Sequence, residues 1–179
     1  MNKSSHKQGF TIIETLVAIA VLMIAIAGPL SIANKGLTGA LASRDQMIAS
    51  YLAQESFEVV KNLRDTNLDA TVNWLDGGGY ALSSCTYNNP CDASAIDLTK
   101  VAAGKANPLR LTTGNYYSHA GAGSLSLFTR YFYLSLPNSP ATPCPNSGTE
   151  CTVTVAVEWI EGIMPYNIKI ANELANTYR

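Results

Sequence analysis

The 179-residue sequence lacks the motifs that most enzymes and nucleic-acid-binding proteins need. It contains no GxSxG, HExxH or phosphate-loop motif, and the glycine stretches at 77–79 and 121–123 lack the spacing of a nucleotide-binding loop. The 12 basic and 13 acidic side chains give a net charge of −1, which provides no electrostatic footprint for DNA. We therefore expect a protein that is not an enzyme, needs no cofactor and binds no nucleic acid, and we expect both glycine stretches to be turns.

Side chains that bind metals are also sparse. The chain has two histidines, of which His6 lies in a short basic N-terminal leader and His119 has no acid or nucleophile at a recognisable spacing. We expect His119 to be a surface residue. None of the four cysteines has the CxxC spacing of a zinc site, so no bound metal is expected.

Charge is almost absent from a long apolar run near the N-terminus. Between Phe10 and Leu30 the only ionisable side chain is Glu14, and the run continues to Ala33. About 20 apolar residues are enough to span a bilayer, so residues 10–33 are predicted to cross a membrane. A carboxylate near a bilayer centre costs about 2.5–3.5 kcal/mol on insertion scales, which makes Glu14 a candidate functional residue.

A cut between Gly9 and Phe10 would supply a partner for Glu14. The new α-amine would lie four residues before Glu14, which is one helical turn away on the same face. A charge pair costs far less in apolar surroundings than either charge alone. The amine is therefore expected to pair with Glu14 of its own subunit or of a neighbour.

The residues from Gly9 onward, Gly-Phe-Thr-Ile-Ile-Glu-Thr-Leu-Val-Ala, follow a leader that contains Lys3 and Lys7. They resemble the class III signal of type IV prepilins and type II secretion pseudopilins. The resemblance implies that a membrane-embedded prepilin peptidase cuts after Gly9 and N-methylates Phe10. It also implies that Glu14 sets subunit register during assembly with other pilin subunits on a pilus assembly platform. The expected precursor is a single-pass inner-membrane protein, and the mature protein belongs to an extracellular or periplasmic filament.

Two other interpretations of the N-terminus stay open. Residues 25–27, Ala-Ile-Ala, precede Gly28 as in an ordinary signal-peptidase site, which would release an exported soluble binding domain. Against this interpretation, Glu14 would lie in the apolar part of the signal and Pro29 would lie just past the cut. A permanently anchored single-span surface protein would instead retain Met1.

The helix is predicted to continue beyond the membrane segment, with a kink at Gly28-Pro29 because Pro29 cannot donate to the carbonyl of Ala25. Apolar residues then recur at alternating spacings of seven and four, which keeps one face of the helix apolar. This stripe consists of Leu30, Leu37, Leu41, Ile48, Leu52, Val59 and Leu63. The polar face is expected to include Glu55, Glu58 and Arg64, and the stretch Asp65-Thr66-Asn67 is expected to end the helix.

The predicted organisation is a leader at 1–9, a membrane or filament-core segment at 10–33, an amphipathic segment at 34–65 and a β-rich head at 66–179. Strands are expected at 109–111, at 124–136 with a bulge near 128–130, and in a hairpin of 153–159 with 166–171 that turns at Glu161-Gly162. Trp74, Tyr80 and Leu82 are expected to pack.

We expect an α+β protein in which the apolar face of an antiparallel sheet lies on the stripe from Leu37 to Leu63. The long loops of 66–123, together with the late hairpin, favour a minor pilin or pseudopilin.

The cysteines form two close pairs along the chain. An even number of cysteines behind an export signal indicates disulfides in an oxidising compartment. Four cysteines allow three connectivities, of which the two local pairs are favoured. These pairs are Cys85–Cys91 and Cys144–Cys151.

Overall fold

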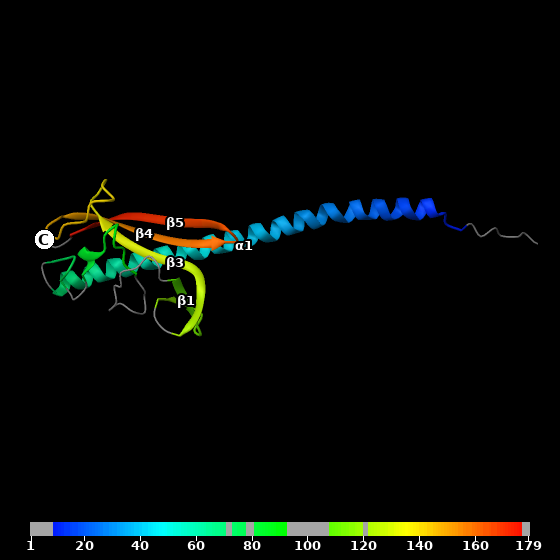
Figure 1. Ribbon diagram of the computed structural model, residues 1–179. Helices are drawn as coiled ribbons and strands as arrows, with labels where there is room; N and C mark the ends of the chain where they lie inside the picture. The colour runs from blue at the N-terminus through cyan, green and yellow to red at the C-terminus, as the bar shows by residue number, and fades with distance from the viewer. Residues whose placement is uncertain (1–8, 71–72, 78–80, 93–107, 120–121, 177–179) are drawn as a thin grey trace, which may run out of the picture. The chain divides into compact units, whose positions relative to one another are not determined.

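The computed structural model describes residues 9–70, 73–77, 81–92, 108–119 and 122–176. These residues form one long helix and a five-stranded antiparallel sheet, which confirms the predicted α+β class (Figure 1). The chain divides into two compact units, Met1–Arg44 and Asp45–Arg179. Of the predicted features, the leader with His6, the packing of Tyr80 and the turn residues Gly78, Gly79 and Gly121 lie outside the described residues.

Helix α1 runs from Ile12 to Ala70. It passes through the predicted end at residues 65–67, so that prediction is wrong. The side chains there are used to support the helix and the loop after it: Thr66 donates back to the carbonyl of Asn62, and Asn67 donates to the carbonyl of Leu75 at 2.8 Å. Pro29 lies inside α1, and the kink at Gly28-Pro29 stays a prediction.

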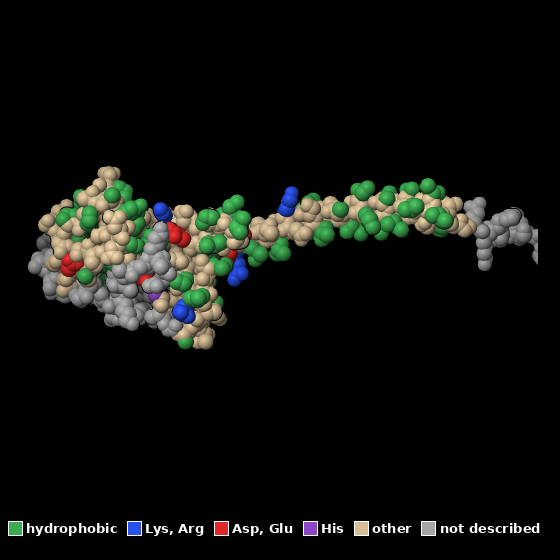
Figure 2. All heavy atoms as spheres, in the orientation of Figure 1, with side chains coloured by type: hydrophobic (Ala, Val, Ile, Leu, Met, Phe, Trp, Pro, Cys, Tyr) green, Lys and Arg blue, Asp and Glu red, His purple; other side chains and the backbone are tan. Residues whose placement is uncertain are grey.

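In the first unit, every described side chain from Gly9 to Leu41 is exposed. Figure 2 shows hydrophobic side chains spread over the surface of this part of the helix, with very few charges among them. Helix α1 is long and apolar enough to cross a membrane. Its N-terminal part therefore carries a large apolar surface that has no cover among the described residues.

In the second unit, α1 packs on the sheet through the C-terminal part of the predicted stripe. Leu52, Val59 and Leu63 are buried and Ile48 is half-buried. The prediction that the sheet lies on this stripe is therefore confirmed for these four residues. Leu37 and Leu41 belong to the first unit, so the start of the covered stripe at Leu37 stays a prediction.

The sheet has the strand order β2-β1-β3-β4-β5, and all neighbouring strands are antiparallel. Its strands are β1 (Pro108–Thr112), β2 (Tyr117–Ser118), β3 (Gly123–Ser135), β4 (Glu150–Glu161) and β5 (Met164–Ala175), and a short 3₁₀ helix covers Leu82–Ser84. The predicted strands at 109–111, 124–136, 153–159 and 166–171 are thus confirmed. The β4–β5 hairpin turns at Gly162, whose φ of 63° suits glycine.

The predicted bulge is also present. Pro108 of β1 pairs with Thr129 of β3, but Arg110 pairs with Leu125, so β3 contains extra residues between two pairs of the ladder. The Ser126 hydroxyl oxygen accepts a hydrogen bond from the amide of Phe128 within the bulge. At the start of β3, a Cβ on Gly123 would lie 2.5 Å from the carbonyl oxygen of Leu111, so only glycine fits this approach of β3 to β1.

The core of the head lies between α1 and one face of the sheet. Phe132 and Leu134 of β3 and alternate valines of β4 are fully buried against the helix. Trp74 and Leu82 are buried as predicted, and the indole of Trp74 donates to the carbonyl of Gly148 at 3.1 Å. Both local disulfides, Cys85–Cys91 and Cys144–Cys151, are present.

Arg64 does not lie on a solvated face as expected. Arg64 is buried. Its guanidinium forms an ion pair with the Asp65 carboxylate and donates a hydrogen bond to the carbonyl of Ala175 at 3.3 Å. Arg64 therefore attaches the end of β5 to the C-terminal part of α1. The long aliphatic part of an arginine side chain can be buried while its charged end finds acceptors, which the periodicity alone does not reveal.

Candidate functional site

The processing motif lies at the start of the described chain and is freely accessible. Gly9 and Phe10 precede α1, and the Phe10 side chain is 78% exposed. Apart from Gly9 and its chain neighbours, no atom of a described residue lies within 4 Å of where a Cβ on Gly9 would be. Packing among the described residues therefore does not require glycine at position 9, and a requirement for it would come from an enzyme that acts there.

Thr11 caps the helix, and Glu14 is part of the cap. The carbonyl of Thr11 accepts hydrogen bonds from the amides of Glu14 and Thr15 at 3.1 and 3.2 Å, and its hydroxyl oxygen accepts from the Glu14 amide at 3.3 Å. Thr11 and Glu14 have the spacing of a capping box, and an acid in the first turn interacts favourably with the positive end of the helix. The pattern Thr-x-x-Glu is the signal in the sequence that identifies this cap.

Because the helix begins after Thr11, Phe10 and Glu14 do not lie one helical turn apart as expected. In the uncut chain Phe10 lies outside α1, so the one-turn helical spacing to Glu14 is not formed there. The peptide bond after Gly9 lies before the first hydrogen bond of the helix. Cleavage would thus leave the helix intact, and pairing of the new amine with Glu14 stays a prediction.

A second cluster of polar side chains lies inside the head, around Arg130 of β3. The Arg130 side chain is fully buried, and its Nη1 donates to Glu55 Oε2 at 2.9 Å and to the carbonyl of Leu52 at 3.0 Å. Burial lowers the pKa of Arg130, while Glu55 and then Asp92 raise it. Glu55 was expected on an exposed face, and this is wrong, because it is the counter-charge of a buried arginine.

His119 belongs to the same cluster, which corrects its assignment to the surface. Its Nε2 lies 3.2 Å from the carbonyl oxygen of Arg130 and 3.7 Å from Asp92 Oδ1, and only 12% of its side chain is exposed. Burial, followed by the charge of Arg130, lowers the pKa of His119 to about 4. The imidazole is therefore neutral at pH 7, and the cluster joins α1, β3 and two loops.

The sequence contained one sign of this cluster. Arg130 lies at a core-facing position of β3, since it pairs with Val157 and shares the alternation of Phe132. A charged residue at such a position requires a buried partner. The partners lie on other elements, so the one-dimensional pattern could not identify Glu55 or His119.

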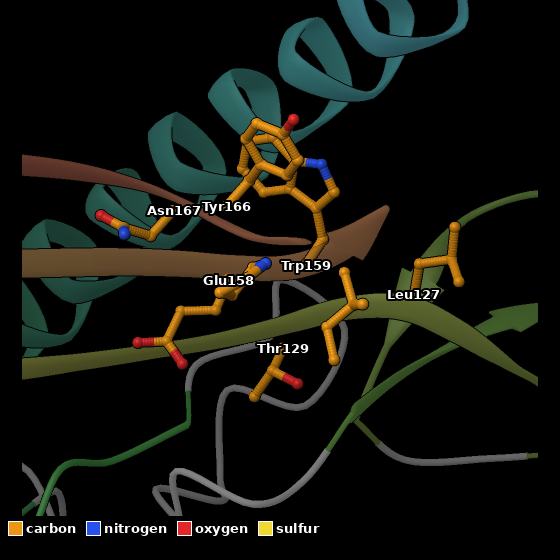
Figure 3. A pocket seen from close by; sticks show the side chains of 8 residues that line it. Leu127, Thr129, Glu158, Trp159, Tyr166 and Asn167 are labelled. Atoms are coloured by element: carbon orange, nitrogen blue, oxygen red, sulfur yellow. The ribbon is translucent and has the colours of Figure 1, made fainter. Parts of the chain in front are cut away.

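A cavity of about 330 Å³ lies beside the β4–β5 hairpin. Figure 3 shows Trp159 and Tyr166 on one face of the sheet, with Glu158 and Thr129 directed to the other. The two rings stack at 5.7 Å, and Glu158 accepts a hydrogen bond from the Tyr131 hydroxyl at 2.7 Å. Burial and this contact raise the pKa of Tyr131. The aromatic and acidic groups therefore do not converge on one point and form no reactive arrangement.

The comparisons with known proteins point to the N-terminal motif. A family model described as the prokaryotic N-terminal methylation motif matches residues 4–28. This segment is the class III signal peptide of type IV pilins and pseudopilins, as the sequence predicted. No curated protein and no solved structure matches the chain.

The chain thus carries the N-terminal motif of prepilin-type proteins and is similar in this segment to type IV pilins and pseudopilins. The motif indicates a structural protein of this type rather than an enzyme, and it implies processing by a prepilin peptidase and assembly with other pilin subunits. The motif and the apolar α1 together fit a membrane-anchored precursor. Among the residues that the structure describes, no group of three His, Cys, Asp or Glu side chains could hold a metal ion.

Proposed function

We propose that this protein is a minor subunit of a type IV pilus or pseudopilus. It is cut after Gly9, N-methylated at Phe10 and assembled by bundling of the N-terminal part of α1. The match of the methylation motif to residues 4–28, directly before a 59-residue helix, is the observation that carries this proposal.

The exposed surface of residues 12–41 supports assembly through this part of the helix. Its apolar side chains are open on every side of α1, which is typical of a helix that is covered by lipid or by other helices. A precursor held by lipid and a filament core made of neighbouring helices would cover the same surface in turn. Transfer between the two environments needs no change within the head.

Glu14 is the one charged side chain in the membrane-spanning part, and its role is to select the position of an incoming subunit. The Phe10 amine of that subunit meets the Glu14 carboxylate of a subunit already docked. A mismatch in register leaves both charges unpaired in apolar surroundings, which typically costs several kcal/mol. The assembly platform, the inner membrane and the other pilin subunits are the partners in this step.

The mature N-terminus tests the proposal directly. Mass spectrometry of the purified protein should find N-methyl-Phe10. An N-terminus at Gly28 would indicate an ordinary signal peptidase and a soluble exported domain, and retention of Met1 would indicate a permanent anchor. Either result would overturn the proposal.

A pair of glycine variants sharpens the test. Gly9→Val should leave a full-length precursor in the membrane. Gly36→Val makes the same change at an exposed helical position where an added Cβ has open space, so this control should be processed normally. A product of wild-type size from Gly9→Val would contradict cleavage at a class III site.

The minor role rests on the head, in which the described residues between α1 and β3 form two short strands and a short 3₁₀ helix and the β4–β5 hairpin comes late in the chain. Sheared filaments should contain this protein as a trace component when their peptides are quantified. A result in which it is the dominant filament protein would overturn the minor role but leave the class unchanged.

A further inference from the structure

A cavity of about 390 Å³ lies between α1 and the segment that leads into β2. Its lining is mostly apolar and aromatic, and all of it belongs to the second unit. The lining residues are Ile48, Tyr51, Leu52, Glu55, Tyr116 and Tyr117.

The tyrosines are available to a ligand. Tyr51 is 65% exposed and Tyr116 is 45% exposed, and the hydroxyls of the three tyrosines make no hydrogen bond to described residues. Two of the rings are in contact with other residues of the head. Tyr117 contacts Phe128 edge to face at 5.8 Å, and the Tyr116 ring lies so close to Gly114 that a Cβ there would be 2.7 Å from it.

Glu55 gives the cavity its charge. One carboxylate oxygen accepts the hydrogen bond from buried Arg130, and the other makes no hydrogen bond to a described residue. The side chain is 35% exposed. Glu55 is therefore anchored at one oxygen and open to the cavity at the other.

The cavity lies beside the buried Arg130 cluster. Glu55 forms an ion pair with Arg130, and His119 is neutral at pH 7 because its pKa is about 4. Of these three side chains, Glu55 lines the cavity, where its carboxylate is partly exposed.

We propose that this cavity binds an alkylammonium cation, with the tyrosine rings against its methyl groups and Glu55 as its counter-charge. Quaternary ammonium groups are recognised in this way by aromatic side chains, because ring faces attract the cation and its methyl groups suit apolar walls. A hydrated ammonium or guanidinium group fits less well, since an apolar lining would remove its water without replacing the hydrogen bonds. The inference does not depend on cleavage after Gly9 or on filament assembly.

Binding can be measured by calorimetry on the full chain in a nonionic detergent, with tetramethylammonium as the probe. The matched neutral probe is tert-butanol, which has a similar size and shape but no charge. We expect tetramethylammonium to bind at least about tenfold more tightly, as cation–aromatic and ionic contacts of this kind allow. Equal binding of the two probes would overturn the proposal and leave only an apolar cavity.

Two pairs of variants locate the effect. Glu55→Gln should weaken tetramethylammonium binding about tenfold, whereas Glu58→Gln, which removes the same charge from an exposed position one turn away, should not change it. Tyr51→Leu should weaken binding severalfold, whereas Tyr166→Leu, outside the cavity, should not. The Tyr51→Leu variant leaves the Arg130 cluster intact, so it tests the site even if Glu55→Gln fails to fold. Wild-type affinity in Tyr51→Leu and in a folded Glu55→Gln would overturn the proposal.

A second comparison separates two sources of the cation. Choline represents a free cation, and phosphocholine represents a lipid headgroup with a phosphate next to the ammonium. Because Glu55 repels a phosphate, choline is expected to bind more tightly. The reverse order would assign a headgroup ligand to the same cavity, and no binding of either would overturn the assignment of the cavity to quaternary ammonium ligands.

Discussion

The exposure of the apolar side chains of α1 differs between its N-terminal and C-terminal parts. From Ile12 to Leu41 every side chain is exposed, although this part is the most apolar of the chain. From Ala49 to Leu68 most of the apolar side chains are buried under the sheet, with Tyr51 exposed. The first part is apolar on all sides and therefore depends on lipid or on other molecules for cover. The second part is apolar on one side and is covered by its own chain.

This difference separates two kinds of mutational effect. Changes in the first part should act on events that involve other molecules, such as assembly, and should leave the stability of the head unchanged. Changes in the second part should lower the free energy of unfolding of the head.

The largest expected effect is on assembly and comes from the first part. Glu14→Leu should still be cut after Gly9 and stay in the membrane, because the anchor becomes more apolar. It should be absent from sheared filaments, because the Phe10 amine of the next subunit to dock on it has no partner and the filament cannot grow past it. Immunoblots of membranes and sheared filaments measure this. Glu58→Leu, the same change in the second part, should be incorporated, and normal incorporation of Glu14→Leu would refute the role of this carboxylate.

The largest expected effect on stability comes from Arg130 in the head. Arg130→Ala removes the buried ion-pair partner of Glu55 and should lower the free energy of unfolding by about 3–5 kcal/mol. Urea unfolding of the full chain in detergent, followed by tryptophan fluorescence, measures the change, since both tryptophans lie in the head. Exposed Lys169→Ala should change it by less than about 0.5 kcal/mol. Equal stability of the two variants would contradict a structural role for the cluster.

A pair of leucine variants compares the two parts of α1 directly. Leu63→Ala removes a buried side chain and should lower the free energy of unfolding of the head by about 2–5 kcal/mol. Leu22→Ala makes the same change at an exposed position of the first part and should leave the urea midpoint of the head unchanged. A similar loss in both variants would show that the two parts are not independent.

Acid should destabilise the head through His119. Because the folded pKa of about 4 lies below the usual 6.5, the unfolded chain binds more protons between these values. The contribution of His119 is therefore fully present above about pH 6.5 and is lost as the pH falls toward 4, by at most about 3 kcal/mol. The difference in unfolding free energy between wild type and His119→Gln should change over this range. A constant difference would show that His119 is solvated in the folded protein.

The smallest expected effect is at the start of α1. Thr11→Ala removes the side-chain acceptor of the cap and should destabilise the first turn by about 1 kcal/mol. Hydrogen exchange at the Glu14 amide should become severalfold faster. Thr15→Ala is the control, because its hydroxyl donates back to the carbonyl of Ile12 and does not cap the helix. If both variants exchange alike, Thr11 does not act through its side chain.

The sequence predicted those features that depend on local pattern. Apolar and polar residues alternate in the sequence of β3, β4 and β5, and the alternation changes phase at the bulge. The structure confirms both features. The end of α1 was not predictable in this way, because Asn67 continues the helix through contacts with a loop that comes later in the chain. Propensity for a helix end was overridden by those tertiary contacts.

The processing site and the interior of the head differ in whether their residues are contiguous in the sequence. The motif around Gly9, Phe10 and Glu14 is contiguous, so the sequence alone identified it. The Arg130 cluster joins residues 75 positions apart, so it cannot be identified from spacing along one segment.

The two disulfides also determine how the head would respond to pulling. Each joins cysteines only 6 or 7 positions apart, so each removes roughly 20 Å of contour length from the unfolded chain. A head stretched between its ends would therefore release nearly all of its chain even when fully oxidised. Its resistance to force would come from the contact of α1 with the sheet and from the long β3–β4–β5 ladders, while the two covalent bonds would keep only two short loops closed.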